Sequence, residues 1–531
     1  MRLIKQLLSL SRGGIILVAT LSLISGVSGA GIAIVTSIAL AGSPPTALLA
    51  GMFFSLCTLH FVTKSLSEIK LIRLTQAMIF EIRVGLSRKI LHTPQSLLEK
   101  LGRQPLFTIL TRDVDTFVMG FHFVPTLIGN IFIILFCLVY IAFLSPIFFA
   151  AIAGLLLAGM LGFHLVEKAP RDKLIVVREK LDTLYILLRS QIDGVRELKL
   201  NQWRRGHNTG LIASSATDVR GLNADALSLY ALVSNAGNIM FYVLIGLFIF
   251  VVPELFSASA GVTLSITLVM LYLVRPVSEI MIILPTLRQS SVALARIEQL
   301  GEDLKEQEAD SVLPALFGGT EISLSLREVF YAYPESNFSV GPIDFELKSG
   351  EVVFLVGGNG SGKTTFAMLL LGLYPPSSGS ISLNGTALTP ETLPSYREHF
   401  AAIFSDFHLF PHLPDTLSGK AETAVHAYLK AFDLAHKVEV KDGRFTTLEL
   451  STGQRKRLAL ILSYLEDKPI YLFDEWAADQ DPAFRKYFYT HILPELKARG
   501  KAVLAITHDD AWFGVADRVI KLDNGTLVAH D

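Results

Sequence analysis

The residues best suited to do chemistry form a glycine-rich stretch, Gly357-Gly358-Asn359-Gly360-Ser361-Gly362-Lys363-Thr364, which fits the pattern GxxxxGK[ST]. An apolar, strand-like run, Glu351–Val356, precedes it, and an apolar, helix-like run, Phe366–Leu371, follows. In this context the pattern predicts a P-loop, in which backbone N–H groups and a helix N-terminus surround phosphate. We expect Lys363 to neutralise the β- and γ-phosphates of ATP, and the Thr364 hydroxyl to bind Mg²⁺. The predicted ATP-binding loop therefore runs from Gly357 through Thr365.

A second candidate lies about 110 residues further along, at the end of the apolar run Ile470-Tyr471-Leu472-Phe473-Asp474-Glu475. Such a run predicts a buried strand that ends in two carboxylates. Asp474 has the position of a Mg²⁺-binding aspartate, and Glu475 that of the general base that orients the attacking water. An acidic pair after a strand is common in isolation, but downstream of a P-loop it indicates ATP hydrolysis.

Between these two elements lies Leu450-Ser451-Thr452-Gly453-Gln454, which resembles the LSGGQ signature of ABC ATPases, with threonine in place of one glycine. The resemblance implies that Ser451, Gly453 and Gln454 contact ATP held by the P-loop of another subunit. Because the chain carries one complete motif set, the simplest partner is a second copy of itself. A different, heterodimeric partner is an alternative that no residue calls for.

The family resemblance assigns further roles residue by residue. Tyr333 matches the aromatic residue that stacks on adenine; the alternative is an ordinary strand aromatic. His508 matches the switch histidine that contacts the γ-phosphate. The usual glutamine of the Q-loop is absent: Ser405 holds its place and Asp406 follows, so we expect Ser405 or Asp406 to serve the metal site.

The rest of the chain must place this ATPase at a membrane. Hydrophobic residues make up 51% of the 531 residues and charged residues 18%, a composition more apolar than that of average soluble proteins. The apolar residues concentrate in the first half. Runs of about 20 apolar residues predict six spanning helices, at about 13–41, 46–66, 121–144, 146–166, 228–252 and 261–284.

These spans form three hairpins, with turns expected at Ser43-Pro44-Pro45, at Ser145-Pro146 and around Glu254. The long segments between hairpins are rich in Lys and Arg, whereas the three turns carry none. The positive-inside rule therefore places both termini in the cytoplasm. We read the apolar N-terminus as an uncleaved first helix, and we expect the charged stretch Thr111–Asp115 to form an inner coupling turn.

The predicted architecture is an all-α six-helix transmembrane domain of the type IV ABC exporter class, residues 1–300, followed by an α/β P-loop nucleotide-binding domain, residues 301–531. The chain resembles the bacterial cyclic-peptide and siderophore exporters, which include lasso-peptide microcin exporters. The resemblance rests on Ser339–Ile343, Gly357–Gly360, Asp474–Pro482, His508–Asp510 and the Ser405-Asp406 departure. It implies a homodimer in the bacterial inner membrane, with ATP and Mg²⁺ as cofactors and a compact modified peptide as cargo.

Polar residues inside the predicted spans are the candidates for contact with that cargo. Arg275 and Glu279 lie four residues apart on the sixth span, where they could also simply pair with each other. Asn235 and Asn238 on the fifth span could line a cavity or bond across helices.

Two other functions fit the same motifs. A lipid flippase would share every ATPase residue, and a non-transport ABC ATPase would share them without needing the six spans. A net charge of −1 gives no reason to expect a nucleic-acid partner.

Overall fold

The computed structural model describes residues 12–41, 47–166, 168–251, 260–304, 321–333, 337–413 and 420–529. The predicted turns at residues 43–45 and around Glu254 lie outside these ranges. The chain divides into two compact units. The first comprises residues 1–84 and 108–300, and the second comprises residues 85–107 and 301–531.

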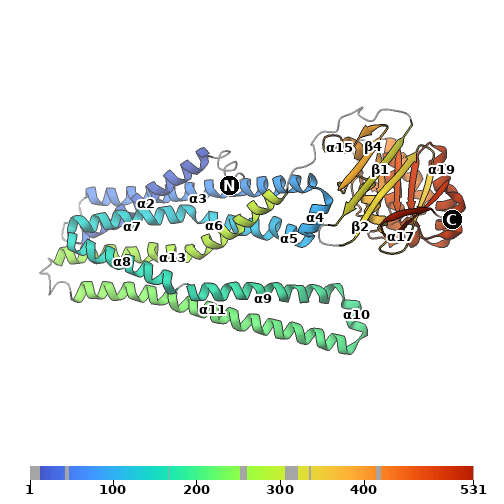
Figure 1. The fold of residues 1–531 in the computed structure, drawn as a ribbon. Helices are drawn as coiled ribbons and strands as arrows, with labels where there is room; N and C mark the ends of the chain where they lie inside the picture. Colours follow the sequence, from blue (N-terminus) through green and yellow to red (C-terminus); the bar gives the residue numbers. More distant parts are fainter. Residues whose placement is uncertain are drawn as a thin grey trace. The chain divides into compact units, whose positions relative to one another are not determined.

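The first unit is made of helices (Figure 1). They are α2 (Arg12–Leu40), α3 (Ala47–Leu91), η1 (Ile109–Asp113), α6 (Val114–His122), α7 (Val124–Leu144), α8 (Pro146–Val166), α9 (Lys168–Asp193), α10 (Val195–Leu200), α11 (Gln202–Phe250) and α13 (Ala260–Asp303). The described residues of the predicted spans are almost all helical; the third span runs from the end of α6 through α7, and α3, α11 and α13 continue well past their spans in one direction. Short α4 (Gln95–Leu101) and α5 (Arg103–Thr108) connect α3 to η1.

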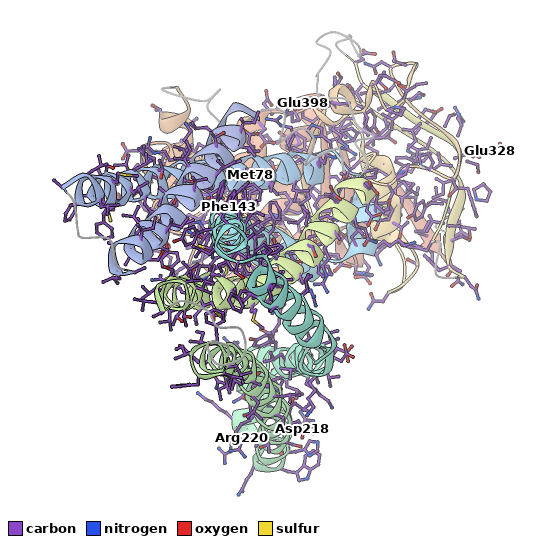
Figure 2. The ribbon with its side chains drawn as sticks, turned by 90° about the vertical axis from the view of Figure 1, so that its left-hand side faces the viewer. Met78, Phe143, Asp218, Arg220, Glu328 and Glu398 are labelled. Carbon is purple, nitrogen blue, oxygen red and sulfur yellow. The ribbon has the colours of Figure 1, made fainter. Side chains whose placement is uncertain are left out.

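Among the described residues, four helices are long and apolar enough to cross a membrane: Gly13–Leu40, Ala47–Leu91, Arg103–Leu144 and Ala260–Asp303. Helices α8 and α11 cover the other two predicted spans. The helices that cover the predicted spans carry many exposed apolar side chains, such as Phe143 of α7, which is 85% exposed and labelled in Figure 2. In water such a surface would be unfavourable, whereas in lipid it is expected.

Helices α9 and α11 pack against each other along their length, joined through α10 (Figure 1). This pair contains the long basic segment between the fourth and fifth predicted spans. Charged residues lie on its surface: Figure 2 labels Asp218 and Arg220 on α11, and Asp218 lies 4.0 Å from Lys180 of α9. Asn201 caps α11 by accepting a hydrogen bond from the Arg204 N–H.

The second unit contains two larger sheets. The six-stranded sheet has the order β12-β11-β3-β10-β9-β6, and all neighbouring pairs are parallel except β11 with β12. Its strands are β3 (Val352–Val356), β6 (Phe400–Ile403), β9 (Ile470–Asp474), β10 (Ala502–Ile506), β11 (Arg518–Asp523) and β12 (Thr526–Ala529). Strands β3, β9 and β10 are buried throughout, as parallel strands covered on both faces must be.

The four-stranded sheet has the order β2-β1-β4-β5 and is antiparallel. Its strands are β1 (Ser323–Ala332), β2 (Ser339–Lys348), β4 (Ser378–Leu383) and β5 (Thr386–Ala387). Asn384-Gly385 joins β4 to β5 and Asn524-Gly525 joins β11 to β12, and both residues of each turn have positive φ, as a two-residue turn of this hand needs.

The helices of this unit include α14 (Lys363–Leu370), α15 (Leu393–Arg397), α16 (Lys420–Ala431), α17 (Thr452–Glu466), α18 (Pro482–Tyr487), η4 (Phe488–Ile492) and α19 (Leu493–Ala498), with 3₁₀ turns η3 (Trp476–Asp479) and η5 (Asp510–Val515). A two-stranded hairpin, β7 (Val440–Lys441) with β8 (Arg444–Phe445), lies in the segment between β6 and α17. The fold class predicted from the sequence, helical membrane domain followed by α/β domain, is thereby observed.

One local prediction is wrong. Thr111–Asp115 does not form a turn, because it lies within a nearly continuous helical run from α5 through η1 to α6. Asp113 is buried and lies 3.8 Å from Arg296 of α13, and Asp115 accepts a hydrogen bond from Arg83 of α3 at 2.7 Å. These charges bind neighbouring helices together. The reversal of the chain lies earlier, at α4.

Candidate active site

The predicted phosphate loop lies between β3 and α14, at the carboxyl end of a central strand. Gly357, Gly360 and Gly362 have φ of 155°, 77° and 103°, a region that favours glycine. A Cβ on Gly357 would lie 2.3 Å from the Leu522 carbonyl oxygen, and one on Gly362 would lie 2.8 Å from Val340. The loop conformation therefore depends on glycine at both positions. It leads directly into the N-terminus of α14.

Inside the loop, two groups are placed to receive an anion. Lys363 is buried, and its Nζ donates hydrogen bonds to the carbonyl oxygens of Gly357 at 2.9 Å and Gly358 at 3.0 Å. Ser361 Oγ is buried and has no hydrogen-bond partner within the described part of the chain. A buried hydroxyl without a partner is costly unless a ligand satisfies it. The residues present therefore fit a bound phosphate, while Gly358, Asn359 and Gly360 remain exposed at the loop's surface.

The Asp474 carboxylate lies across from this loop, at the end of β9, and only 3% of the residue is exposed. Burial raises its pKa above the usual range, and the nearby Glu475 charge raises it further. Hydrogen bonds from the Ser405 N–H and hydroxyl, and the charge of Lys363, lower it again. A buried carboxylate in this environment is suited to a cation, which would stabilise its ionised form.

The Ser405 and Asp406 side chains occupy different places. Ser405 donates hydrogen bonds to Asp474 through its N–H and its hydroxyl. Asp406 is 77% exposed, and its Oδ2 lies 3.7 Å from a guanidinium nitrogen of Arg103 at the start of α5, which belongs to the same compact unit. Ser405 therefore lies beside the carboxylate predicted to bind Mg²⁺, whereas Asp406 pairs with Arg103, and the metal-binding role of both residues stays a prediction.

Glu475 has an unusual backbone, with φ 49° and ψ 37° in the left-handed region. Its N–H donates to the Ile506 carbonyl of β10 at 3.0 Å, and its Oε1 lies 3.2 Å from His508 Nε2. Both side chains are partly exposed, Glu475 at 38% and His508 at 48%. The predicted base and the predicted switch histidine are thus brought together at the carboxyl ends of β9 and β10. Left-handed conformations of non-glycine residues cluster at functional sites.

Tyr333 lies close to the start of α14. Its hydroxyl is 2.8 Å from Oγ1 of Thr365, which is buried, whereas Thr364 is exposed. The ring of Tyr333 also meets Tyr331 and Tyr374 edge to face. Tyr333 is therefore fixed beside the phosphate loop, where an aromatic surface could receive adenine.

The signature residues begin helix α17. Ser451 is the N-cap, and Ser451 and Gln454 form a reciprocal capping box. Ser451 and Thr452 are exposed. Gly453 packs so closely that a Cβ would lie 2.6 Å from the Asp479 carbonyl oxygen, and its own carbonyl accepts from Gln480 Nε2 at 3.1 Å. The signature is consequently attached to the segment that follows Glu475.

In the helical unit, Arg275 and Glu279 pair with each other, with Arg275 Nε and Glu279 Oε1 2.8 Å apart. This confirms the pairing that their spacing in the sequence allows. Glu279 also accepts a hydrogen bond from Asn130 of α7 at 2.9 Å. Both residues line a cavity of about 320 Å³ among α2, α3, α7 and α13, together with His60, Lys64 and Asn130. Asn235 is exposed on α11, and the side chain of Asn238 lies outside the described residues.

Sequence reasoning missed two participants. Asn130 is the only amide side chain within the apolar third span, and that was the available signal. Lys456 is a charged residue in α17 that is 1% exposed, and no local pattern distinguishes it from its neighbours Arg455 and Arg457.

The part of the chain that carries this site matches a known protein family. The family model for the ABC transporter matches residues 340–478, which include the phosphate loop, the signature and the acidic pair. The chain is 36% identical over 463 residues to the ATP-binding protein SyrD of Pseudomonas syringae pv. syringae, covering 84% of this chain and 82% of that protein. This chain is an ABC transporter.

Other relatives match smaller parts of the transporter. An ATP-dependent lipid A-core flippase of Aliivibrio fischeri is 28% identical over 49% of this chain and 47% of its own length. The solved structure of a bacterial Atm1-family ABC exporter with ATP bound superposes with a TM-score of 0.76 at 18% identity, covering 98% of this chain and 95% of that one. This chain therefore has the ABC exporter fold over nearly all its length, and it is an ATP-hydrolysing transporter.

Proposed function

We propose that the transporter acts as a homodimer in the bacterial inner membrane and uses ATP to export a compact modified peptide, such as a lasso or cyclic peptide, or a peptide siderophore. The observation that carries the ATP-driven part is the convergence of Lys363, Asp474, Ser405, Glu475 and His508 at the carboxyl ends of adjacent parallel strands. Ligands bind at this edge in open α/β sheets.

In the proposed mechanism, the loop from Gly357 to Thr365 surrounds the phosphates and Lys363 neutralises their charge. Asp474, Ser405 and Thr364 hold Mg²⁺, which supplies charge neutralisation at the phosphates when bound. Glu475 takes the proton of the attacking water. His508, whose Nε2 lies 3.2 Å from Glu475 Oε1, orients the Glu475 carboxylate and contacts the γ-phosphate.

The homodimer is supported by the completeness of the motif set in one chain and by the exposure of Ser451 and Thr452 at the N-terminus of α17. That terminus directs its dipole outward, which suits a phosphate presented by a second copy. With two copies, two ATP molecules are enclosed between the two nucleotide-binding domains. Closure of these domains opens the transmembrane cavity alternately to the two sides of the membrane.

The proposed location is supported by the six predicted apolar spans, and the proposed orientation by the distribution of basic residues. The multi-pass arrangement with both termini in the cytoplasm places the ATPase units where ATP is available. The bilayer itself covers the exposed apolar helix surface.

The peptide cargo is supported by the resemblance of the chain to peptide and siderophore exporters. The charged cavity adds to it: a site lined by Arg275, Glu279, Lys64, His60 and Asn130 suits a cargo with charged and hydrogen-bonding groups. A flippase for a lipid is the second candidate, because the chain is similar to lipid A-core flippases over about half its length.

The deciding experiment compares cargoes on the purified protein in proteoliposomes. We expect modified peptides to stimulate ATP hydrolysis and to enter inside-out vesicles in an ATP-dependent way, while a fluorescent lipid does not change leaflet. The control is Glu475→Gln, which should bind ATP but release no phosphate at steady state. ATP-dependent lipid movement without peptide transport would replace our cargo proposal, and undiminished turnover by Glu475→Gln would remove the assignment of the base.

A further inference from the structure

Lys456 is among the most completely buried side chains of the ATPase unit, with 1% of its surface exposed. It lies on α17, five residues after the signature serine. Its Nζ makes two contacts of 2.7 Å, donating to the carbonyl oxygen of Glu475 and pairing with Oδ2 of Asp479. A buried ammonium is costly unless it is paired and hydrogen-bonded, so these contacts must be maintained for the lysine to stay buried.

Glu475, whose carbonyl oxygen accepts the hydrogen bond from Lys456, has its backbone in the left-handed region. Such a conformation costs on the order of 1–3 kcal/mol and persists only when surrounding structure enforces it. Two hydrogen bonds do so here: the Glu475 N–H binds the Ile506 carbonyl, and the Glu475 carbonyl binds Lys456. The direction of the Glu475 side chain, and so its distance to His508, depends on both.

We propose that Lys456 is a positioning residue for ATP hydrolysis, which holds the Glu475 backbone in its left-handed conformation and fixes the following segment through Asp479. This inference rests on the proposed role of Glu475 as the base. Lys456 does not touch the nucleotide in this proposal and acts only through Glu475.

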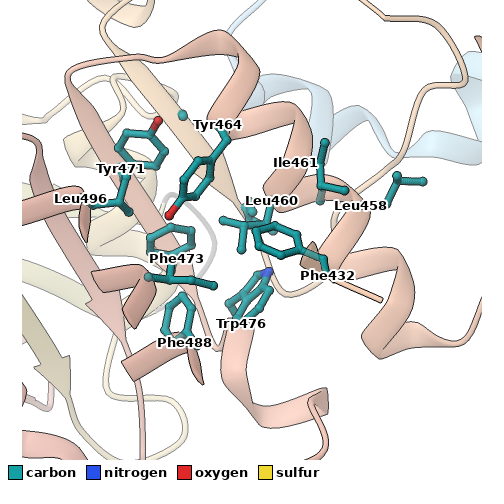
Figure 3. Packing of buried hydrophobic residues seen from close by; sticks show 14 of the residues in the cluster. Phe432, Leu458, Leu460, Ile461, Tyr464, Tyr471, Phe473, Trp476, Phe488 and Leu496 are labelled. Atoms are coloured by element: carbon teal, nitrogen blue, oxygen red, sulfur yellow. The ribbon is translucent and has the colours of Figure 1, made fainter. Parts of the chain in front are cut away.

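The surrounding packing supports a fixed lysine. Trp476, directly after Glu475, donates its indole N–H to the Lys456 carbonyl at 3.0 Å and stacks on Phe488. Figure 3 shows Trp476 and Phe488 among the apolar side chains that α17 contributes, such as Leu460. Helix α17 and the segment after β9 are therefore joined by polar bonds next to a dense apolar core, which leaves Lys456 little freedom to move.

The chain contains a closely matched control lysine. Asp467 caps the other end of α17 with φ 48° and ψ 37°, nearly the values of Glu475. Lys501 donates to the Asp467 carbonyl at 2.9 Å and pairs with its Oδ1 at 2.8 Å. Lys501 and Lys456 thus each donate a hydrogen bond to the carbonyl oxygen of a residue in the left-handed conformation. Asp467, unlike Glu475, has no predicted role in hydrolysis.

The test compares Lys456→Met and Lys501→Met in the purified full-length protein in nanodiscs. Both should lower the thermal midpoint. Only Lys456→Met should lower kcat for ATP, by roughly 10- to 100-fold, with KM changed by less than about 3-fold, because misplacing a catalytic group by an ångström has effects of that size. Lys456→Arg, which keeps the cation and its donors, should restore part of the loss.

One further variant completes the test. Asp479→Asn removes the partly exposed partner of Lys456, is expected to fold, and should lower kcat by roughly 3- to 10-fold.

These outcomes distinguish the positioning role of Lys456 from the role of Glu475 as the base. A kcat for Lys456→Met equal to that of Lys501→Met, or an unchanged kcat for Asp479→Asn, would overturn the positioning role while leaving Glu475 as the base. Full turnover by Glu475→Gln would instead overturn the proposed mechanism itself. If Lys456→Met does not fold, Asp479→Asn and Lys456→Arg still decide the question.

Discussion

The close contact between the signature and the segment after Glu475 gives a quantitative prediction for Gly453→Ala. The added Cβ would lie 2.6 Å from the Asp479 carbonyl oxygen, and ordinary contact requires 3.4 Å or more, so a backbone must move by about 0.8 Å. The neighbouring atom is a carbonyl oxygen in the short turn η3, which cannot rotate away as a flexible side chain could. Overpacking of this kind typically costs about 1–3 kcal/mol, more than the roughly 0.5–1 kcal/mol that alanine gains over glycine in a helix.

The displacement is transmitted to Glu475, because η3 begins directly after that residue. A shift close to 1 Å at a catalytic group reduces the rate by up to about 100-fold. We therefore expect Gly453→Ala to lower kcat for ATP by roughly 10- to 100-fold. Binding of ATP to the protein's own phosphate loop should persist. Steady phosphate release and equilibrium binding of a fluorescent ATP analogue would measure the two quantities separately.

Gly514→Ala is the matched control, since a Cβ there meets nothing within 4 Å and its φ is unexceptional. It should leave kcat within about 2-fold of the wild type, as surface substitutions usually do. A Gly453→Ala protein with the kcat of Gly514→Ala would refute the reasoning, because it would show that the signature and η3 can separate by 0.8 Å without disturbing Glu475.

Three further predictions concern the cation site and the helical unit. Because burial raises the folded-state pKa of Asp474, its ionised form destabilises the nucleotide-free protein as pH rises through that pKa. Asp474→Asn should therefore raise the thermal midpoint without nucleotide at pH 7 and abolish stabilisation by Mg²⁺-ATP; a lowered midpoint contradicts this. Ser405→Ala removes a hydrogen bond that favours the ionised carboxylate, so the Mg²⁺ concentration for half-maximal ATPase should rise about 3- to 10-fold, whereas Ser405→Gln should stay closer to wild type. Asn130→Leu leaves Glu279 with one partner fewer and should weaken cargo-stimulated ATPase while basal ATPase persists; loss of both rates together would indicate a purely structural role.

The ATPase half could be predicted from the sequence because its chemistry requires fixed residue types at fixed spacing. The phosphate loop needs glycines at positions with positive φ, and Gly357, Gly360 and Gly362 have them. The acidic pair follows a strand that is buried throughout, as its apolar run predicts. The roles of these residues in catalysis stay predictions, although their positions match.

The contacts that fix these residues could not be predicted, because they join segments by geometry and not by pattern. Lys456 looks like any basic residue on a helix surface until α17 is placed against β9. Asp406 looks like a metal ligand beside Ser405, but successive residues of a loop point in different directions, and Asp406 is directed to Arg103. Likewise, Thr111–Asp115 has the composition of an exposed turn, yet pairing with Arg83 and Arg296 makes the same charges compatible with a packed helix.

The arrangement around α17 also bears on how two copies would work together. The helix begins with residues expected to meet ATP bound to the second copy, and five residues later Lys456 binds the carbonyl of Glu475, the residue proposed as the base for the protein's own ATP. Its N-terminus cannot shift without moving Gly453 against Asp479, and Asp479 is joined to Lys456, which holds the Glu475 carbonyl. Contact with the partner's nucleotide and placement of the local base are therefore two consequences of one helix position, so each closure of the dimer should complete both sites together.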